Sequence, residues 1–193
     1  MTTVPPTTLA LLAERYSPAQ RRTAHAALEL FATHGVGGTS LQMIADALGV
    51  TKAAVYHQFP SKDDIVVAVL ELQLRPIEAI LEQAEAAGSG PAARDALLVG
   101  VIDAVVSNRG SLSTLQRDPV LFRLLAEHPP SLRLWTRIFA ILLGDDADDR
   151  ALVRSSVLSA VIGSVNYPFV VGLDDDVVRD ELLAIARRLL TPG

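Results

Sequence analysis

The chain contains two lysines, and both lie in one short block of the sequence. Lys52 and Lys62 fall within residues 39–62, which read TSLQMIADALGVTKAAVYHQFPSK. His57 lies in the same block. A lysine donates hydrogen bonds and positive charge to an anion or to a guanine, and a histidine can donate or accept. The block therefore offers the chemistry of a polyanion-binding surface.

No other group of residues has the spacing of a catalytic or metal site. None of the histidines forms the His-x-x-x-His pair that places two ligands on one helical face; they are His25, His34, His57 and His128. The acidic run from Asp145 to Asp149 lacks the alternating ligands, central glycine and final glutamate of a calcium loop. There is no cysteine, no glycine-rich phosphate loop and no serine nucleophile motif. The sequence therefore predicts no enzyme activity, no metal and no cofactor.

Charge is unevenly distributed along the chain. The net charge is −5, but residues 15–62 hold five basic residues against Glu29 and Asp46. Residues 63–193 hold 12 arginines against 19 acidic residues. A basic N-terminal segment before an acidic body indicates that a polyanion binds at one end.

Composition favours helices over strands. Half of the 193 residues are hydrophobic and only 5% are aromatic, and Ala, Leu and Val supply most of the apolar content. The absence of cysteine fits a reducing cytosol, and the first residues do not resemble a signal peptide, so a cytoplasmic location is expected. Residues 155–173 carry no charge, but four serines, Asn166 and Pro168 interrupt them. A buried interface helix explains this stretch better than a membrane span.

Capping residues mark the expected helices. Ser17-Pro18-Ala19-Gln20 opens a helix that runs to about His34, before a glycine break, and Thr39-Ser40 opens a second helix that ends at Gly49. Thr51 caps a third helix to about Gln58, and Ser61 caps a fourth to about Ala87, which Pro76 should kink. Five further helices are expected at about 91–108, from 118, from 129, at about 149–167 and at about 176–190. The prediction is an all-α fold of about nine helices.

The second and third helices have the pattern of a helix-turn-helix. A tight turn at Gly49 would set them at a steep angle, so that the second could enter the major groove of DNA. Ala45 permits a close crossing, and Ile44, Leu48, Val50 and Val55 are expected to pack beneath. Short helix-glycine-helix segments also occur in ordinary helical proteins, which is the alternative reading of this pattern alone.

The block resembles the N-terminal motif of the TetR/AcrR family of transcriptional regulators. The family pattern is matched by Thr39, Ile44, Ala45, Gly49, Val50, Thr51, Tyr56, Phe59 and Lys62, and Phe31 and Gly35 match the helix before it. One departure is that the family often has a glycine where this chain has Ala53 or Ala54. The resemblance implies a three-helix DNA-binding domain joined to a larger helical domain that binds a ligand and forms the dimer.

Roles on DNA can be assigned within this motif. Lys52, Ala53 and His57 are the expected base contacts, with the Ala53 methyl suited to a thymine methyl. The expected phosphate contacts are Thr51, Tyr56 and Lys62, supported by Thr39, Gln42 and Gln58. Tyr56 could instead be a half-buried packing residue, and Gln42 and Gln58 could be plain surface residues.

Aromatic and polar side chains in the C-terminal part could line a ligand pocket. Such pockets combine apolar walls with a few polar groups. The candidate residues are Phe122, Leu125, His128, Trp135, Phe139, Asn166 and Tyr167. Side chains of this kind are more often plain core residues, which is the alternative reading.

Two strips of residues near the C-terminus are typical of a dimer interface. Small residues that allow a close helix approach recur in the eighth expected helix at Ser156, Ala160, Gly163 and Ser164. A heptad-like seam follows in the ninth at Val178, Leu182, Ile185 and Leu189. Both strips could instead pack on the chain's own body.

These observations predict residues 1–16 as a flexible arm, 17–62 as the DNA-binding domain and 63–193 as the ligand-binding and dimerisation domain. The expected function is that of a homodimeric repressor, released from a palindromic DNA operator by a small, apolar effector. The alternative is a helical ligand carrier or interaction module that keeps the motif only as structure. The two lysines favour the first, because a purely structural helix pair does not require them.

Overall fold

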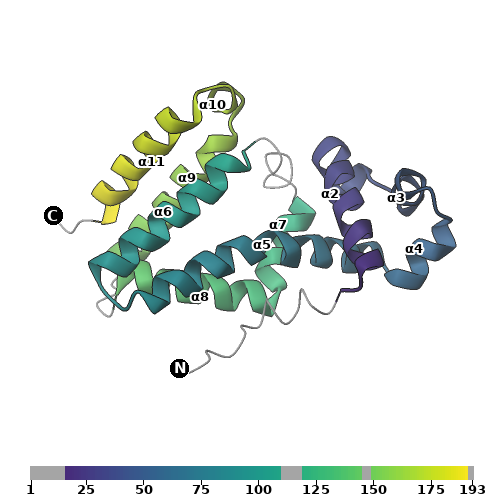
Figure 1. The fold of residues 1–193 in the computed structure, drawn as a ribbon, viewed down its shortest axis with the longest axis horizontal. Helices are drawn as coiled ribbons and strands as arrows, with labels where there is room; N and C mark the ends of the chain where they lie inside the picture. The colour runs from purple at the N-terminus through teal and green to yellow at the C-terminus, as the bar shows by residue number, and fades with distance from the viewer. Residues whose placement is uncertain (1–15, 110–118, 145–148, 191–193) are drawn as a thin grey trace. The chain divides into compact units, whose positions relative to one another are not determined.

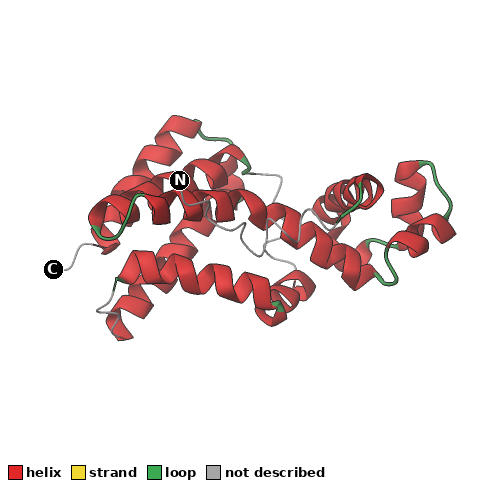
Figure 2. Ribbon diagram, turned by 60° about the horizontal axis from the view of Figure 1, so that its bottom comes forward, coloured by secondary structure: helices red, strands yellow, loops and turns green. Residues whose placement is uncertain are grey.

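The structure, a computed structural model, describes residues 16–109, 119–144 and 149–190, and no strand occurs among them (Figures 1 and 2). Nine helices in this part have seven residues or more: α2 (Pro18–Gly38), α3 (Leu41–Leu48), α4 (Lys52–Gln58), α5 (Lys62–Ala86), α6 (Pro91–Ser107), α7 (Pro119–Glu127), α8 (Pro129–Leu143), α9 (Asp149–Gly163) and α11 (Asp175–Leu190). Between α9 and α11 lie the short η2 (Ser164–Asn166) and α10 (Pro168–Val171). The prediction of an all-helical fold with about nine helices is confirmed.

The chain forms two compact units. The first comprises Met1–Arg75 and Thr114–Leu132, and the second comprises Pro76–Ser113 and Arg133–Gly193. Helix α5 passes from the first unit to the second at Pro76, and α8 does so after Leu132. The predicted functional boundary at residues 62 and 63 stays a prediction. Most of the predicted arm lies outside the described residues, but Tyr16 at its end is buried.

Helix α2 begins at the capping residues that the sequence predicts. The Ser17 Oγ accepts a hydrogen bond from the Gln20 backbone N–H at 3.2 Å, and the Gln20 side chain accepts one from the Ser17 backbone N–H at 3.0 Å. Gly35 adopts φ 71°, a left-handed conformation that favours glycine, and it kinks α2 one residue after the predicted end at His34. A final turn then runs to Gly38.

Helices α3 and α4 form the predicted pair around a tight turn. Ser40 caps α3, and Gly49 ends it in a left-handed conformation with φ 65°. Ile44, Ala45 and Val55 are fully buried between α2, α3 and α4. Val50 was expected to pack beneath them, but its side chain is 41% exposed because it lies in the turn itself.

Helix α5 begins at the predicted cap, where the Ser61 Oγ accepts a hydrogen bond from the Asp64 N–H at 3.1 Å. Its first turns bury Ile65, Val66 and Val69 in the first unit. The helix continues through Pro76 to Ala86.

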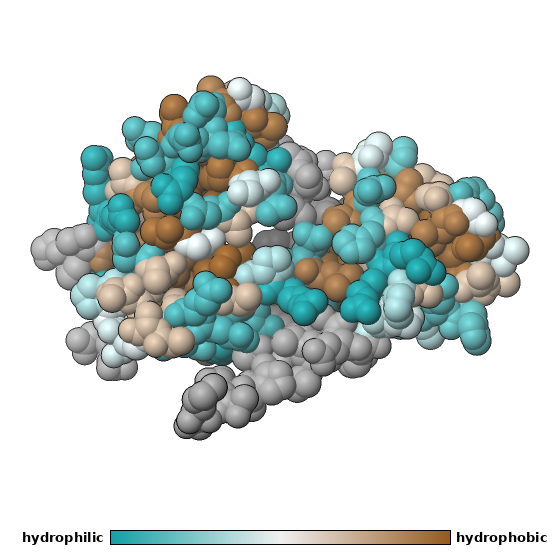
Figure 3. Space-filling model, in the orientation of Figure 1, coloured by the Kyte–Doolittle hydropathy of each residue, from teal (hydrophilic) through white to brown (hydrophobic). Residues whose placement is uncertain are grey.

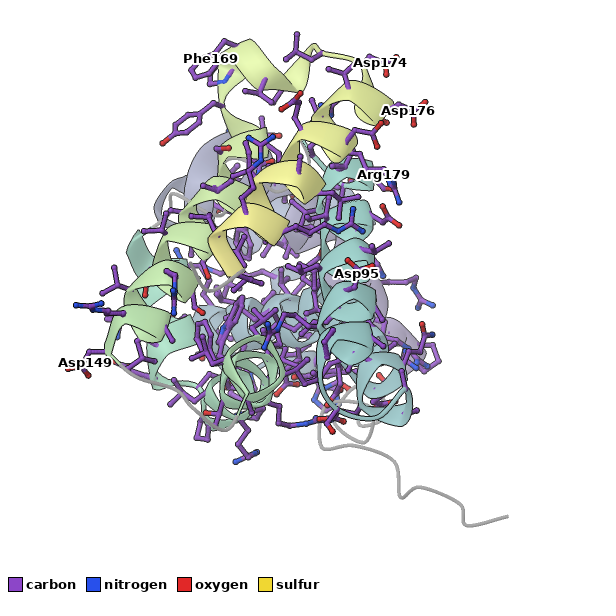
Figure 4. All side chains as sticks on the ribbon, turned by 90° about the vertical axis from the view of Figure 1, so that its left-hand side faces the viewer. Asp95, Asp149, Phe169, Asp174, Asp176 and Arg179 are labelled. Carbon is purple, nitrogen blue, oxygen red and sulfur yellow. The ribbon has the colours of Figure 1, made fainter. Side chains whose placement is uncertain are left out.

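Helices α6, α9 and α11 lie side by side in the second unit (Figure 1). Ion pairs join α11 to α6, since Arg187 and Arg179 donate hydrogen bonds to Asp95 and Asp103 at 2.7 and 2.5 Å. Figure 4 labels one residue of each pair, Asp95 and Arg179. The Arg187 hydrogen bond holds the pKa of Asp95 below its ordinary value.

Helix α9 is shorter than predicted, and the uncharged stretch near the C-terminus does not form one helix. Helix α9 was expected to reach Tyr167, but it ends at Gly163, where η2 and α10 turn the chain toward α11. The uncharged stretch at residues 155–173 is therefore divided among three elements. Among the described residues, no helix is both long and apolar enough to cross a membrane.

Candidate nucleic-acid interface

Helix α4 presents one polar face to solvent and one apolar face to the core. Lys52, Ala53, Tyr56 and His57 are exposed, while Val55 is fully buried on the opposite side. The exposed positions are one and four residues apart, so they share one side of the helix. We call these four residues the reading face. All three of the predicted base contacts lie on it.

Within the reading face, Lys52 and Tyr56 contact each other. The Lys52 Nζ lies 5.7 Å from the centroid of the Tyr56 ring, within the range of a cation–π interaction. Tyr56 is 47% exposed, so about half of the side chain is accessible to a ligand. Its ring lies beside the lysine ammonium, and its hydroxyl is of a type that can donate a hydrogen bond to a phosphate.

Lys62 ties the start of α5 to the junction between α2 and α3. Its Nζ donates hydrogen bonds to the Val36 and Thr39 carbonyl oxygens at 2.9 and 3.2 Å. An ammonium has three N–H donors, so one is left for a phosphate. Lys62 thus has a positioning role that the sequence does not reveal, beside the predicted phosphate contact.

The Thr39 hydroxyl is part of the same junction. It donates a hydrogen bond to the Gly35 carbonyl at 2.8 Å, and the residue is only 2% exposed. A side chain so buried cannot reach a phosphate in this conformation. Thr39 therefore supports the interface from within, and we do not place it among the direct phosphate contacts.

The remaining predicted phosphate contacts differ in exposure. Thr51 is exposed, and its Oγ1 accepts the Ala54 N–H at 3.2 Å, which leaves its hydroxyl hydrogen able to donate. Gln42 is exposed and donates to Asp46 at 2.7 Å, one turn along α3. Gln58 is half-buried, and its side-chain oxygen accepts the Thr23 hydroxyl at 2.7 Å.

Two residues that position α4, Gln20 and Thr23, were not predicted from the sequence to do so. Gln20 donates from its side chain to the Gln58 backbone carbonyl at 3.0 Å, and Thr23 bonds the Gln58 side chain. These contacts fix the end of α4 on α2. The signal for Gln20 was present, since it was recognised as a capping residue, but its second partner is 38 residues away and no local pattern reveals it.

The predicted pocket residues are only partly brought together. Trp135 and Phe139 pack with ring centroids 6.4 Å apart, and Asn166 is buried. Tyr167 is 46% exposed and stacks on Phe169, with centroids 5.5 Å apart. His128 belongs to the first unit and contacts Glu71 and Ser131. The side chains of Phe122 and Leu125 lie outside the described part of the structure.

The predicted dimer strips divide into exposed and buried residues. Ser156 and Ala160 are exposed on α9, Gly163 and Ser164 are half-buried, and on α11 Ile185 is 38% exposed and Leu189 half-buried. Val178 and Leu182 are each only 6% exposed, because this side of α11 packs on α6 and α9. For these two residues the alternative reading holds, and they are not available to a partner in this conformation.

Apolar side chains that the sequence analysis did not select are exposed on the same elements. Their exposed fractions are 51% for Leu152, 63% for Val153, 44% for Val157, 77% for Phe169 and 57% for Val177. Phe169 projects away from α10 (Figure 4), and hydrophobic residues lie at the surface among hydrophilic ones at the top of Figure 3. These exposed apolar side chains are candidates for contact with a partner.

Known proteins match this chain most clearly over the helix-turn-helix. Residues 24–69 match the family described as "Bacterial regulatory proteins, tetR family". The chain is 41% identical to the HTH-type transcriptional regulator SrpR of Pseudomonas putida over 59 residues, which are 31% of this chain and 28% of SrpR. It is 28% identical to the uncharacterized HTH-type transcriptional regulator YezE of Bacillus subtilis over 147 residues, 67% of this chain and 76% of YezE.

Solved structures resemble the chain over most of its length. NalD, the secondary repressor of the MexAB-OprM multidrug efflux pump in Pseudomonas aeruginosa, superimposes with a TM-score of 0.68 at 23% identity, over 91% of this chain and 96% of NalD. PfmR, a TetR family transcriptional regulator from Thermus thermophilus, gives 0.63 at 22% identity, over 86% and 97%. At these identities the likeness shows the fold.

The described fold and the α3–α4 pair thus define an all-helical protein with an N-terminal helix-turn-helix. Its residues 24–69 resemble the tetR family of bacterial regulatory proteins, and the segment matched in SrpR spans 28% of the length of that relative.

Proposed function

We propose that this protein is a transcriptional repressor that binds a palindromic DNA operator as a homodimer and is released by a small, apolar effector. The observation that carries the proposal is the reading face, where Lys52, Ala53, Tyr56 and His57 stand exposed on the second helix of a helix-turn-helix. A helix fits the major groove of B-DNA, where each base pair presents a distinct set of donors and acceptors.

The residues of the reading face suit different parts of the duplex. Lys52 can donate to guanine O6 and N7, His57 can donate or accept, and the Ala53 methyl can contact a thymine methyl. Thr51, Tyr56 and the remaining Lys62 donor suit phosphates, with Gln42 and Gln58 beside them. The Lys52–Tyr56 contact links the proposed base contacts to the proposed phosphate contacts. The base-reading lysine lies over the ring of Tyr56, and the hydroxyl of the same ring would bind a phosphate.

The exposed apolar residues of α9, α10 and α11 support a homodimer. A single recognition helix reads few bases, whereas a two-fold pair reads both halves of a palindrome. We propose that the partner covers Leu152, Val153, Val157 and Val177, together with the small residues Ser156, Ala160 and Gly163. On α11, Ile185 and Leu189 remain in the proposed interface, and Val178 and Leu182 do not.

Repression is supported by likeness to a named regulator. NalD, with which the chain shares its fold, is described as a repressor of an efflux pump. Half-buried Trp135 and Phe139 and buried Asn166 could contribute an apolar wall and a polar group to an effector site in the second unit. A repressor of bacterial genes would act in the cytoplasm, where the DNA is.

Selection from a random duplex pool tests this proposal. The wild-type protein is incubated with duplexes that carry a randomised centre, and bound molecules are recovered and sequenced. We expect an inverted repeat whose half-sites lie about one helical turn apart, or a multiple of it. Recovery of unrelated sequences, or of no DNA at all, would contradict the proposed function and favour a ligand carrier or interaction module.

A further inference from the structure

Four polar side chains in the first unit form a buried cluster that the DNA contacts do not use. Tyr16 is 8% exposed, Glu71 3% and Ser131 0%, and the His128 side chain is 11% exposed. We call these residues the Glu71 cluster. Burying a carboxylate costs free energy unless hydrogen bonds replace those it made with water, and an apolar side chain of similar size would often stabilise a helical core as well.

The Glu71 carboxylate bridges two segments that are far apart in the sequence. The Tyr16 hydroxyl donates to Glu71 Oε2 at 2.6 Å, and His128 Nε2 lies 3.1 Å from Glu71 Oε1. An ionised carboxylate only accepts hydrogen bonds, so the His128 tautomer protonated at Nε2 is the one that can donate to it. The other ring nitrogen, Nδ1, lies 2.8 Å from the Ser131 Oγ. Each carboxylate oxygen therefore holds a different segment.

On one side, the Glu71 cluster contacts the end of α4. The Tyr16 ring packs on Phe59, the residue that ends α4, with centroids 6.1 Å apart. The next residue, Ser17, caps α2 together with Gln20, whose side chain also donates to the last carbonyl of α4. A shift of Tyr16 would therefore move the end of α4.

On the other side, the cluster reaches the corner between α7 and α8. His128 lies between these helices, and its backbone carbonyl accepts the Leu132 N–H at 3.1 Å in the first turn of α8. Ser131 lies in the same turn. Both contacts of His128 therefore depend on how this corner is folded.

We propose that Glu71 is a positioning residue of the reading face: its carboxylate holds Tyr16 and His128 at once, so that the α7–α8 corner sets the orientation of α4. This inference rests on the proposed DNA-binding function. When both hydrogen bonds are present, α4 is fixed in the orientation that enters the groove. Less conformational entropy is then lost when the protein binds DNA. A rearrangement of the corner that withdraws His128 loosens Tyr16 and weakens DNA binding.

Single and double substitutions test the proposal on the full-length protein. Tyr16→Phe removes the hydroxyl and keeps the ring on Phe59, and His128→Leu removes both ring nitrogens. The probe is the duplex that the wild-type protein selects from the random pool. Affinity is measured at a temperature at which circular dichroism shows every variant to be fully folded, so that lost stability alone does not alter it.

We expect each single variant to bind the duplex about tenfold more weakly, within the usual range of coupling between sites. Because Tyr16 and His128 act through the same carboxylate, the double variant should bind no more weakly than whichever single variant binds DNA less tightly. His128→Gln restores an N–H donor and should recover most of the affinity. Glu71→Gln should resemble Tyr16→Phe, whereas Glu127→Gln, the same charge change at an exposed residue beside the corner, should leave the affinity unchanged.

Three results would overturn the inference while leaving the proposed function intact: wild-type affinity in folded Tyr16→Phe, single-variant effects that multiply in the double variant, or no recovery in His128→Gln. If the wild-type protein selects no duplex, the proposed function fails first, and this inference fails with it.

Discussion

Replacement of Lys62 separates two roles that the structure assigns to one side chain. Lys62→Met keeps the length of the aliphatic stem and removes the ammonium, which donates to the Val36 and Thr39 carbonyls at 2.9 and 3.2 Å. Lys52→Met makes the same chemical change on the only other lysine, which is exposed on the reading face. The pair therefore compares a lysine that holds backbone carbonyls with one that faces solvent.

The expected loss of stability follows from these two hydrogen bonds. A hydrogen bond to a charged group contributes about 1.5–3 kcal/mol. The contacts are only part-buried, so water can hydrate the abandoned carbonyls, and we expect a total loss of about 2 kcal/mol. For a chain of this size, that loss lowers the midpoint of thermal unfolding by about 4–8 °C. Lys52→Met should leave the midpoint nearly unchanged.

Thermal unfolding followed by circular dichroism measures this difference, and DNA titrations measure the second role. Lys62→Met should weaken binding to all duplexes alike and reduce the salt dependence by about one unit per protomer, whereas Lys52→Met should change the preferred sequence. Equal midpoints for Lys62→Met and the wild type would refute the positioning role. A changed sequence preference in Lys62→Met but not in Lys52→Met would show that the two DNA roles are reversed.

Three further predictions concern the second unit. Gly163→Trp should give a folded monomer by sedimentation, because no atom lies within 4 Å of a Cβ added there; a persistent dimer would place the interface elsewhere. Gly100→Val should lower the free energy of unfolding in urea by about 2 kcal/mol, because a Cβ added at Gly100 would lie 2.5 Å from Ile80 Cγ2; unchanged stability would contradict this close approach. Because Arg187 lowers the pKa of Asp95, this pair should stabilise the fold above the ordinary pKa of 3.8 and lose that effect as the pH falls through the lowered value. Asp95→Asn should remove this contribution from the acid-unfolding curve. An acid-unfolding curve identical to that of the wild type would show that the pair does not stabilise the fold.

The sequence predicted those features whose causes are local. Ser17, Ser40, Thr51 and Ser61 start helices because their side chains satisfy N–H groups three residues ahead, so a window of a few residues contains the whole cause. Gly49 ends α3 for a similarly local reason, its left-handed conformation. The exposed side of α4 followed from helical periodicity alone.

Contacts between distant residues were not predictable in this way. The bond between Tyr16 and Glu71 joins positions 55 residues apart, and Lys62 reaches a carbonyl 26 residues away. On α11, the apolar heptad seam could not show which of its residues the chain's own helices cover. Val178 and Leu182 pack on those helices, whereas Ile185 of the same seam is 38% exposed, and further exposed apolar residues lie at Val177 and on α9.

The most direct test of the central claim is the salt dependence of binding to the selected duplex. Lys62 of two protomers brings two lysines to phosphates, and at about −0.9 for each neutralised phosphate the logarithmic slope is about −1.8. Raising the salt concentration fourfold should then weaken binding by about 12-fold, with the selected duplex still preferred over a scrambled one. Affinity that does not change with salt, or that is equal for both duplexes, would contradict the claim that this chain is an operator-binding regulator.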